Sequence, residues 1–331
     1  MTDSFPLSDV GVLLVNLGTP DAPDPPAVRK FLAEFLSDPR VVEIPPALWK
    51  PVLYGVILRT RPAKTAEAYR KIWTNEGSPL MAISKRQAAA LRERFGESIC
   101  IGLAMRYGSG SIGYAISKMV DHGFNRILVA PLYPQYCGAT TASVMDAVTA
   151  QLRSMRSQPA IRTLPPYYSA PEYVAALSDS IAAGVAALPF KPDVVLTSYH
   201  GMPIEYLVKG DPYYCDCLVT TRLVRERLGW SEDFLKVTFQ SRFGPDEWLK
   251  PYTDKTLEEL GQQKKKVALV APAFSADCIE TLEELAITGR EQFVHAGGGH
   301  DDYAYIPCLN DSDGGMTMLE SVVRRELGGW I

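Results

Sequence analysis

The segment Val10-Gly11-Val12-Leu13-Leu14-Val15-Asn16-Leu17 is a continuous apolar run near the start of the chain, and the turn-forming Gly18-Thr19-Pro20 follows it. A short apolar run that ends at turn residues is typical of a strand that is buried on both faces of a parallel sheet. Further runs of this kind lie at residues 99–105, 126–131, 192–198, 235–240 and 267–272. We therefore expect strands at all six places.

Segments with helical spacing separate these runs, and we expect helices over residues 84–95, 113–123, 139–155, 171–188 and 217–228. Strands that alternate with helices of this length predict parallel βαβ units. The chain has 331 residues, which corresponds to about two domains of ~150 residues each. The sequence therefore predicts an α/β fold with two doubly wound sheets, and the proline-rich stretch at residues 164–168 is the natural boundary between them.

The composition excludes several classes of protein. Hydrophobic residues make up 47% and charged residues 22% of the chain, so it is neither disordered nor fibrous. The net charge is −4 and the charges are interspersed, so no basic field is available to hold nucleic acid. The clearest basic run, Lys264-Lys265-Lys266, leads directly into an expected strand, and we interpret it as the solvated entry to that strand.

The sequence also bears on membranes and compartment. No segment reaches the ~20 apolar residues that span a bilayer, and residues 1–8 lack the basic start of a signal peptide. The apolar stretch at residues 44–58 contains prolines and Lys50, and Arg59 and Arg61 follow it. It has two interpretations: an apolar lip that touches a membrane or a greasy ligand, and an irregular core segment. Six cysteines are no disulfide framework, so a reducing cytoplasm is expected.

The segments that follow the expected strands are rich in aromatic, arginine, histidine and acidic residues. In open α/β folds, ligands bind at the carboxyl ends of the strands. We therefore expect one cleft that takes a flat, apolar ligand, with polar chemistry at its centre. No glycine-rich dinucleotide or phosphate-binding motif follows the first strand, so neither of those sites is supported.

His200, Glu280 and Glu284 are the candidates for proton and metal chemistry. His200 stands directly at an expected strand end, where a histidine can act as a general base near neutral pH. Its alternative is a hydrogen-bonded structural histidine. Glu280 and Glu284 are four residues apart and so share one face of the helix expected there. Opposite a histidine, such a pair can bind a divalent metal transiently or pass protons. The alternative is a set of acids that the helix dipole favours at the N-terminus.

The cysteines leave one further metal hypothesis. Only Cys215 and Cys217 form a close pair, and without a second pair a closed zinc site is not favoured. If Cys137 met these two in space, a fourth thiolate could complete a [2Fe-2S] ligand set. Buried or idle thiols are the favoured interpretation.

Seven segments taken together resemble the ferrochelatase family. They are residues 13–20, 105–108, 132–136, 198–203, 210–213, 239–249 and 274–285. Each motif is weak alone, but they follow the order of the family from about Val10 to Leu309, which makes the set specific.

The resemblance implies a metal-inserting lyase that places Fe²⁺ into protoporphyrin IX to form protohaem, the last step of haem biosynthesis. It implies two Rossmann-like domains, residues 1–165 and 166–311, each a parallel sheet flanked by helices, with the active-site cleft between them. A helix at about residues 312–331 can pack back on the first domain. Fe²⁺ and protoporphyrin IX are then the substrates. We expect a cytoplasmic protein, with a peripheral contact at the inner membrane through residues 44–58 as a further hypothesis.

The resemblance also implies roles for single residues. His200 matches the active-site histidine of the family and Glu280 the carboxylate that faces it, so both are expected to be catalytic. His200, Glu280 and Glu284 are expected to meet the metal. The positions that match the porphyrin pocket are Leu17, Arg61, Tyr69, Ser78, Arg106, Tyr107, Tyr133, Trp248 and Phe274.

These roles agree with the chemistry of insertion. Two pyrrole protons must leave, and the free pKa of histidine, about 6.5, suits a base at neutral pH. Carboxylates must hold Fe²⁺ weakly enough to release it. Aromatic walls can bind and bend the macrocycle.

The sequence departs from the family pattern at three places. Cys278 stands where eukaryotic relatives often have histidine. Cluster-bearing members often place several cysteines near the C-terminus, whereas no cysteine follows Cys308 here. Cys215-x-Cys217 follows Gly210-Asp211-Pro212, where the commoner continuation is a proline and a polar residue. The alternatives are a chelatase for another tetrapyrrole such as coproporphyrin III and a porphyrin carrier without catalysis. The presence of His200 and Glu280 favours the enzyme.

Overall fold

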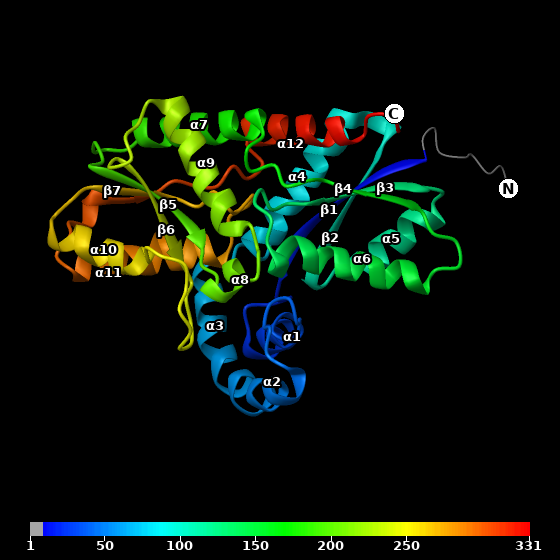
Figure 1. Ribbon diagram of the computed structural model, residues 1–331, viewed down its shortest axis with the longest axis horizontal. Coiled ribbons are helices and arrows are strands. Elements are labelled where there is room, and N and C mark those ends of the chain that lie inside the picture. The colour runs from blue at the N-terminus through cyan, green and yellow to red at the C-terminus, as the bar shows by residue number, and fades with distance from the viewer. Residues whose placement is uncertain (1–8) are drawn as a thin grey trace. The chain divides into compact units, whose positions relative to one another are not determined.

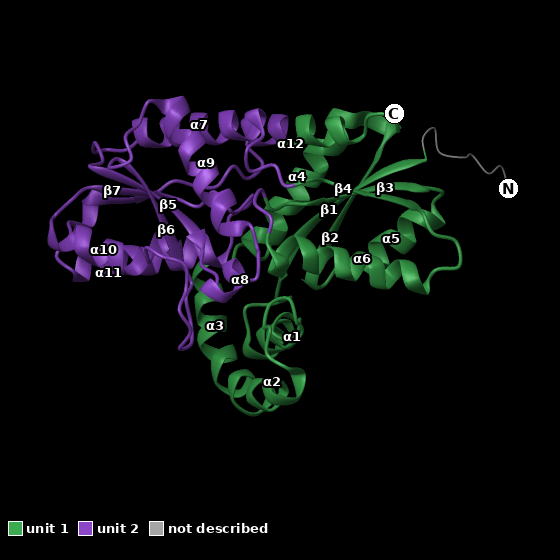
Figure 2. Ribbon diagram, in the orientation of Figure 1, with its two compact units in different colours: residues 1–133, 137–165, 319–331 green, residues 134–136, 166–318 purple. Residues whose placement is uncertain are grey.

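The computed structural model describes residues 9–331, which form two compact units (Figure 2). Unit 1 comprises residues 1–133, 137–165 and 319–331, and unit 2 comprises residues 134–136 and 166–318. Residues 1–8, on which the expectation about a signal peptide rests, lie outside the described part. The expected domains at 1–165 and 166–311 stay a prediction.

Unit 1 is built on a four-stranded parallel sheet (Figure 1). Its strands are β1 (Val10–Thr19), β2 (Cys100–Gly108), β3 (Arg126–Pro131) and β4 (Ala160–Thr163), in the order β2-β1-β3-β4. The central strand β1 is almost entirely buried, and its residue Leu14 pairs with Leu103 on one side and Ala130 on the other. An apolar run is thus required at β1, because both faces and both edges of that strand are covered.

Helices flank the sheet of unit 1. They are α1 (Pro25–Phe35), α4 (Pro79–Phe95), the 3₁₀ turn η2 (Gly96–Ser98), α5 (Ile112–Asp121), the π-helical turn η3 (Gly138–Ala142) and α6 (Ser143–Ser154). Asp24 caps α1 by accepting a hydrogen bond from the Ala27 amide, and Ser111 caps α5 in the same way through Tyr114. Side chains that cap the first turn satisfy amide groups that a helix leaves without partners.

Residues 46–72 form a continuous helical excursion: α2 (Pro46–Val52), the π-helical η1 (Leu53–Ile57) and α3 (Leu58–Ile72). Between residues 44 and 58, only Leu53 and Leu58 are buried, while Leu48 is 68% exposed. The alternative of an irregular core segment is therefore wrong. The prolines of this segment do not prevent a helix. Pro46 lies in the first turn, where a backbone N–H would have no intrahelical acceptor, so its absence costs nothing.

Unit 2 repeats the strand order of unit 1. Its strands are β5 (Val194–His200), β6 (Leu235–Gln240), β7 (Val267–Val270) and β8 (Tyr303–Tyr305), all parallel, in the order β6-β5-β7-β8. Leu196, Leu269 and Phe293 lie in its core. The prediction of an α/β fold with two parallel sheets flanked by helices is thus confirmed.

The helices of unit 2 follow the strands in the same alternation. They are α7 (Pro171–Ala186), α8 (Ile204–Val208), α9 (Tyr213–Leu228), α10 (Thr253–Gln262), the π-helix η4 (Glu280–Gly289), α11 (Arg290–His295) and the 3₁₀ turn η5 (His300–Asp302). The helix expected after β7 is therefore a π-helix in the structure, with a wider turn than the α-helix that we expected.

The last helix, α12 (Asp313–Glu326), begins in unit 2 and continues into unit 1. Within unit 1, Arg94 pairs with Glu320 at 3.1 Å. Arg162 on the edge strand β4 donates to the carbonyls of Glu326 and Gly328, and its guanidinium stacks on the ring of Trp330. The end of the chain thus covers the edge of the sheet of unit 1.

Candidate active site

His200 is the last residue of β5 and is half-buried. The expected strand ended at residue 198, and the two extra residues carry the histidine to the carboxyl end of the sheet. Its Nδ1 lies 2.7 Å from the carbonyl oxygen of Gly201. A carbonyl oxygen can only accept, so Nδ1 carries the hydrogen, and in the neutral ring Nε2 is the basic nitrogen.

Glu284 lies on η4 and is held by the residues that end β6. The backbone amide of Ser241 donates to Glu284 Oε1 at 2.7 Å, and the Ser241 hydroxyl donates to Oε2 in a very short contact. Gln240 Nε2 donates to the carbonyl oxygen of Glu280 at 2.7 Å and to Glu284 Oε2 at 3.3 Å. Ser241 adopts a left-handed backbone with φ of 64°, which turns its amide and hydroxyl toward one carboxylate.

The electrostatics around Glu284 link the three predicted residues. Burial raises the pKa of Glu284, and the negative charge of Glu280 adds to the rise, whereas the Ser241 hydrogen bonds and the charge of His200 oppose it. His200 and Glu280 therefore lie within electrostatic reach of Glu284. A carboxyl group with a raised pKa accepts and releases protons closer to neutral pH than an exposed glutamate does.

The start of η4 is fixed by a buried carboxylate. Asp277 is 4% exposed and accepts hydrogen bonds from the side chains of Thr281, Tyr305 and Asn310. The Asn310 side chain in turn accepts from the Asp277 amide at 2.8 Å. These bonds hold the first turn of the helix against the loop after β8. They thereby fix the position of the helix that carries Glu280 and Glu284.

In the described residues 9–331, no group of three or more His, Cys, Asp or Glu side chains is arranged as a closed metal site. His200, Glu280 and Glu284 are thus near one another without forming a preassembled ligand cage.

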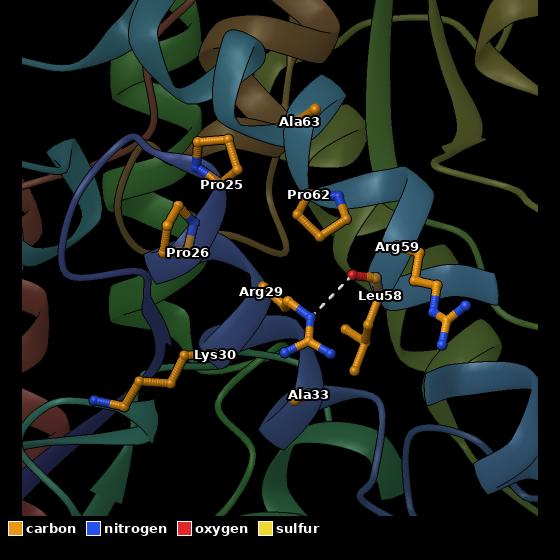
Figure 3. A pocket seen from close by; sticks show the side chains of 9 residues that line it. All are labelled: Pro25, Pro26, Arg29, Lys30, Ala33, Leu58, Arg59, Pro62 and Ala63. Carbon is orange, nitrogen blue, oxygen red and sulfur yellow. Dashed lines mark hydrogen bonds between the residues drawn. The ribbon is translucent and has the colours of Figure 1, made fainter. Parts of the chain in front are cut away.

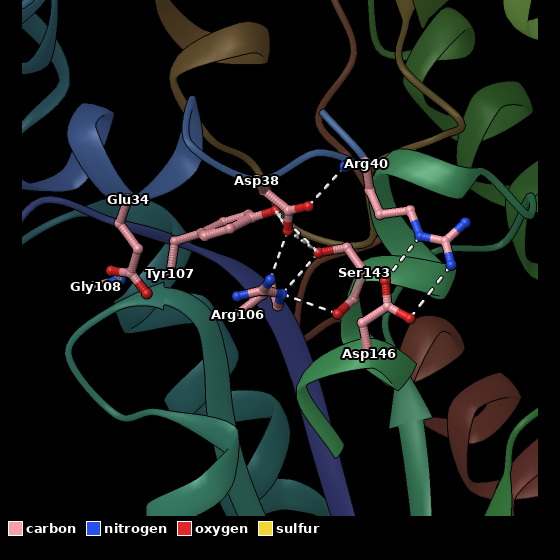
Figure 4. Close-up of polar contacts among 8 residues, drawn as sticks. All are labelled: Glu34, Asp38, Arg40, Arg106, Tyr107, Gly108, Ser143 and Asp146. Carbon is pink, nitrogen blue, oxygen red and sulfur yellow. Dashed lines mark hydrogen bonds and ion pairs between the residues drawn. The ribbon is translucent and has the colours of Figure 1, made fainter. Parts of the chain in front are cut away.

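The carboxyl end of β2 in unit 1 carries a second polar cluster (Figure 4). Two of its members, Arg106 and Tyr107, are residues that we expected at the porphyrin. Arg106 forms an ion pair with Asp38 and donates to the Ser143 hydroxyl at 2.7 Å. The Tyr107 hydroxyl donates to Asp38 Oδ2 at 2.8 Å, and Ser143 donates to the same oxygen at 2.6 Å. Tyr107 is fully buried, and its hydroxyl faces Asp38.

Asp38 is the centre of this cluster. Its burial disfavours the charged form, but hydrogen bonds from Ser143, the Arg40 amide and Tyr107, together with the charge of Arg106, hold its pKa below the usual range. Arg40 beside it reaches Asp146 at 2.8 Å (Figure 4). The cluster therefore joins the segment after α1 to β2 and to the start of α6.

The other predicted porphyrin residues differ in exposure. Tyr69, Ser78 and Trp248 are buried, Leu17, Tyr133 and Phe274 are half-buried, and Arg61 is exposed on α3. Tyr69 packs edge-on against Trp73 with ring centroids 5.9 Å apart, and Trp248 lies 5.2 Å from Phe243. Ser78 precedes α4 without a side-chain cap.

The three cysteines of the cluster hypothesis differ in exposure. Cys215 is exposed and Cys217 is buried, because residues two apart on α9 point to different sides of the helix. Cys137 is buried before η3 in unit 1. A [2Fe-2S] ligand set from these cysteines stays a prediction, and we derive no step through one.

Sequence reasoning missed several residues that hold the functional side chains. Gln240 and Ser241 were visible only as members of a strand end, and nothing in the sequence links them to Glu284. Asp38 and Ser143 gave no signal, since their partners are distant in the chain.

Comparison with known proteins decides the family. The model of the family described as Ferrochelatase matches residues 9–327. The chain belongs to the ferrochelatase family. Among curated relatives, the ferrochelatase of Mesorhizobium japonicum is 52% identical over 327 residues, covering 97% of this chain and 92% of the relative. The ferrochelatase of Rhizobium meliloti is also 52% identical, covering 97% of this chain and 96% of the relative.

Ferrochelatases insert iron into porphyrin in haem biosynthesis, so the predictions of family, enzyme and reaction are confirmed. Among solved structures, the fold is similar to that of "SirB from Bacillus subtilis with Fe3+", with a TM-score of 0.57, 12% identity and coverage of 96% of each chain. A sirohydrochlorin chelatase SirB from Bacillus subtilis subspecies spizizenii in complex with cobalt gives a TM-score of 0.54 at 10% identity. At such identities the likeness concerns the fold alone.

Proposed function

We propose that this ferrochelatase converts Fe²⁺ and protoporphyrin IX to protohaem with His200 as the general base and Glu280 and Glu284 as the carboxylates that meet the metal. The observation that carries the proposal is the position of Glu284. It is held by Ser241 and Gln240, within electrostatic reach of His200 and Glu280.

His200 takes a pyrrole proton at Nε2. The Gly201 carbonyl holds the hydrogen on Nδ1, so the lone pair of the neutral ring is on Nε2. After proton transfer the ring is cationic, and the carboxylate of Glu284 favours that charge. Because the Gly201 carbonyl holds Nδ1, the ring presents Nε2 to the pyrrole proton in a fixed direction.

Glu280 and Glu284 hold Fe²⁺ and receive protons in turn. Two adjacent carboxylates attract a divalent cation, and their mutual repulsion falls when a cation or a proton is shared. Glu284 already accepts three hydrogen bonds from Ser241 and Gln240, which lowers its capacity as a ligand. The metal is therefore bound weakly enough to pass to the porphyrin.

The porphyrin is contacted by Leu17, Arg61, Tyr69, Ser78, Tyr133, Trp248 and Phe274. Arg106 and Tyr107 are assigned to the porphyrin as well, and because Asp38 and Ser143 engage their polar atoms and Tyr107 is fully buried, their part is to support the residues that touch the ligand.

The protein works in the cytoplasm with a peripheral contact to the inner membrane through residues 44–58. Among the described residues, no helix has the length and apolar character needed to cross a bilayer. The exposed apolar side chains of Leu48 and Val56 support the peripheral contact.

The experiment compares His200→Ala with His122→Ala, which alters an exposed histidine at the end of α5. Purified protein is incubated anaerobically with Fe²⁺ and protoporphyrin IX, and the haem bands are followed. We expect His200→Ala to lose at least about 100-fold in turnover, as for removal of a general base, and to keep porphyrin binding. Normal turnover by His200→Ala contradicts the base role. Turnover of coproporphyrin III alone, or binding without insertion by the unaltered protein, contradicts the substrate assignment.

A further inference from the structure

A groove of about 610 Å³ lies between α1 and α3 (Figure 3). Lys30 and Arg59 stand on opposite sides of it with their charged ends directed apart, and Arg29 Nε donates to the carbonyl oxygen of Leu58 at 3.1 Å. The cations of this groove therefore do not converge on one ligand. In unit 2, by contrast, several polar groups converge on one buried side chain, that of Gln240.

Gln240 is the last residue of β6, and it is only 4% exposed. Its Nε2 donates to the carbonyl oxygen of Glu280 at 2.7 Å and to Glu284 Oε2 at 3.3 Å. A backbone carbonyl can only accept, so the NH₂ group of the amide faces η4 and the amide oxygen faces away from it. The two bonds use both hydrogens of Nε2, and they hold both glutamates from one side chain.

The amide oxygen of Gln240 is held from the opposite side. Ser198 Oγ, on β5, donates to Gln240 Oε1 at 2.8 Å. The Ser198 hydroxyl also lies 2.8 Å from the hydroxyl of Thr253, the first residue of α10. A flip of the amide would place Oε1 against the Glu280 carbonyl, with two acceptors facing each other. The amide therefore keeps one orientation.

The main chain of Gln240 reaches the residue that holds His200. Gln240 and His200 are paired residues of the parallel strands β6 and β5. The Gly201 amide donates to the carbonyl oxygen of Gln240 at 2.8 Å, and the Gly201 carbonyl oxygen lies 2.7 Å from His200 Nδ1. A Cβ atom at position 201 would lie 2.6 Å from the Gln240 carbonyl oxygen, so this close approach requires glycine.

We propose that Gln240 is a positioning residue for iron insertion, which sets the spacing between His200 and the carboxylates of Glu280 and Glu284. Its main chain holds the peptide that anchors the histidine, and its side chain holds the helix that carries the carboxylates. The proposal rests on the roles proposed above for these three residues. Reacting groups that are misplaced by about 1 Å can lose about 100-fold in rate, so a residue that contacts both sides matters to turnover.

The test is Gln240→Met, which keeps an unbranched side chain but removes the amide. Anaerobic assays of the full-length protein vary Fe²⁺ and protoporphyrin IX separately. We expect kcat to fall about 10- to 100-fold, the effect of losing a group that orients metal-binding residues. The KM for Fe²⁺ is expected to rise, because the two carboxylates lose a shared donor. The KM for the porphyrin is expected to stay unchanged.

The matched control is Thr221→Val. Thr221 lies on α9, is fully buried, and its hydroxyl shares hydrogen bonds with those of Thr197 and Tyr199 on β5. The control thus removes buried hydrogen bonds at the same sheet, and it is expected to lower the unfolding temperature while kcat and both KM values stay unchanged. Each variant is assayed below its own unfolding temperature. Equal changes of kcat and KM in Thr221→Val and Gln240→Met show general destabilisation and overturn the proposal.

Ser198→Ala tests the orientation of the amide by itself. It removes the donor to Gln240 Oε1 and leaves Nε2 in place, so a smaller rise in the KM for Fe²⁺ is expected. Unchanged kcat and KM for Fe²⁺ in Gln240→Met, or a rise in the porphyrin KM alone, overturn the positioning role. If Gln240→Met does not fold, unchanged kinetics of Ser198→Ala overturn it.

His200→Ala is assayed beside these variants and separates the two proposals. Normal turnover by His200→Ala contradicts the base role on which the positioning role rests. Loss of turnover in His200→Ala together with full turnover in Gln240→Met leaves the base role standing and overturns the positioning role alone.

Discussion

The two units have the same strand order, but Asp38 of unit 1 and Glu284 of unit 2 are held in opposite ways. In unit 1, Asp38 faces the guanidinium of Arg106, and its pKa is held below the usual range. In unit 2, the hydrogen-bond donors to Glu284 are Ser241 and Gln240, which are neutral, and its pKa is raised. Asp38, whose charge is neutralised by a guanidinium, fixes structure, whereas Glu284, which has only neutral hydrogen-bond donors, keeps an affinity for a proton or a cation.

The largest expected effect tests the open carboxylate. Glu284→Gln preserves the shape and can keep the bond from the Ser241 amide, but it removes the charge that attracts Fe²⁺ and protons. We expect turnover with Fe²⁺ and protoporphyrin IX to fall about 100-fold, the scale of a lost acid–base group. Burial raises the pKa of Glu284, which means that its charged form costs stability at neutral pH. The neutral glutamine removes that cost, so the variant is expected to unfold at the same or a higher temperature. Full turnover in the haem assay contradicts the comparison.

The closed carboxylate is tested by Asp38→Asn. The change leaves the half-covered charge of Arg106 without its partner, and breaking a buried pair of this kind costs about 3 kcal/mol. The pKa of Asp38 is lowered, so its contribution is present above the ordinary pKa of an aspartate, about 4, and is lost as the pH falls below it. Urea unfolding at pH 7 measures the cost of the substitution. The same measurement at acid pH measures how much of the contribution of Asp38 is lost.

The control for this prediction is Asp146→Asn, which breaks the exposed pair with Arg40. Its cost is expected to be below about 1 kcal/mol, as for other surface pairs. If Asp38→Asn costs no more than Asp146→Asn, the cluster is not a structural anchor.

The smallest expected effect concerns Asp216, a second buried acid of unit 2. Burial raises its pKa from 3.8 to about 6, and hydrogen bonds from the Tyr136 amide and Tyr168 only partly oppose this. The stability that this carboxyl group gives is present below about pH 4 and is lost as the pH rises through 6. Asp216→Asn is therefore expected to stabilise the protein by about 1 kcal/mol at pH 8 and to have no such benefit at pH 4. Destabilisation at pH 8 in urea unfolding contradicts the cost of the buried charge.

The sequence predicted the central strands well because burial on both faces forces apolar runs such as 10–17 and 267–272. It missed β4 and β8, which are short edge strands with Arg162 and Tyr305 in them and so lack that pattern. Helical spacing also could not distinguish the π-helix η4 from an α-helix, because both place residues four apart on nearly the same side.

Single candidate residues of the site can be proposed from the sequence, whereas the contacts that hold them cannot. His200 and Glu280 stand in recognisable motifs at a strand end and a helix start. Asp38 lies 68 residues from Arg106 and 105 from Ser143, and only the folded chain brings them together. The same holds for Ser241 and Glu284, which are 43 residues apart.

The course of α12 has a consequence for how the protein is made. Translation proceeds from the N-terminus, and domains generally fold as they emerge. The edge strand β4 comprises residues 160–163. The groups that its residue Arg162 contacts belong to Glu326, Gly328 and Trp330, which are synthesised much later. All segments of unit 2 are therefore synthesised before the residues that cover the edge of the unit 1 sheet, so that edge stays open in the nascent chain until residues 326–330 have emerged.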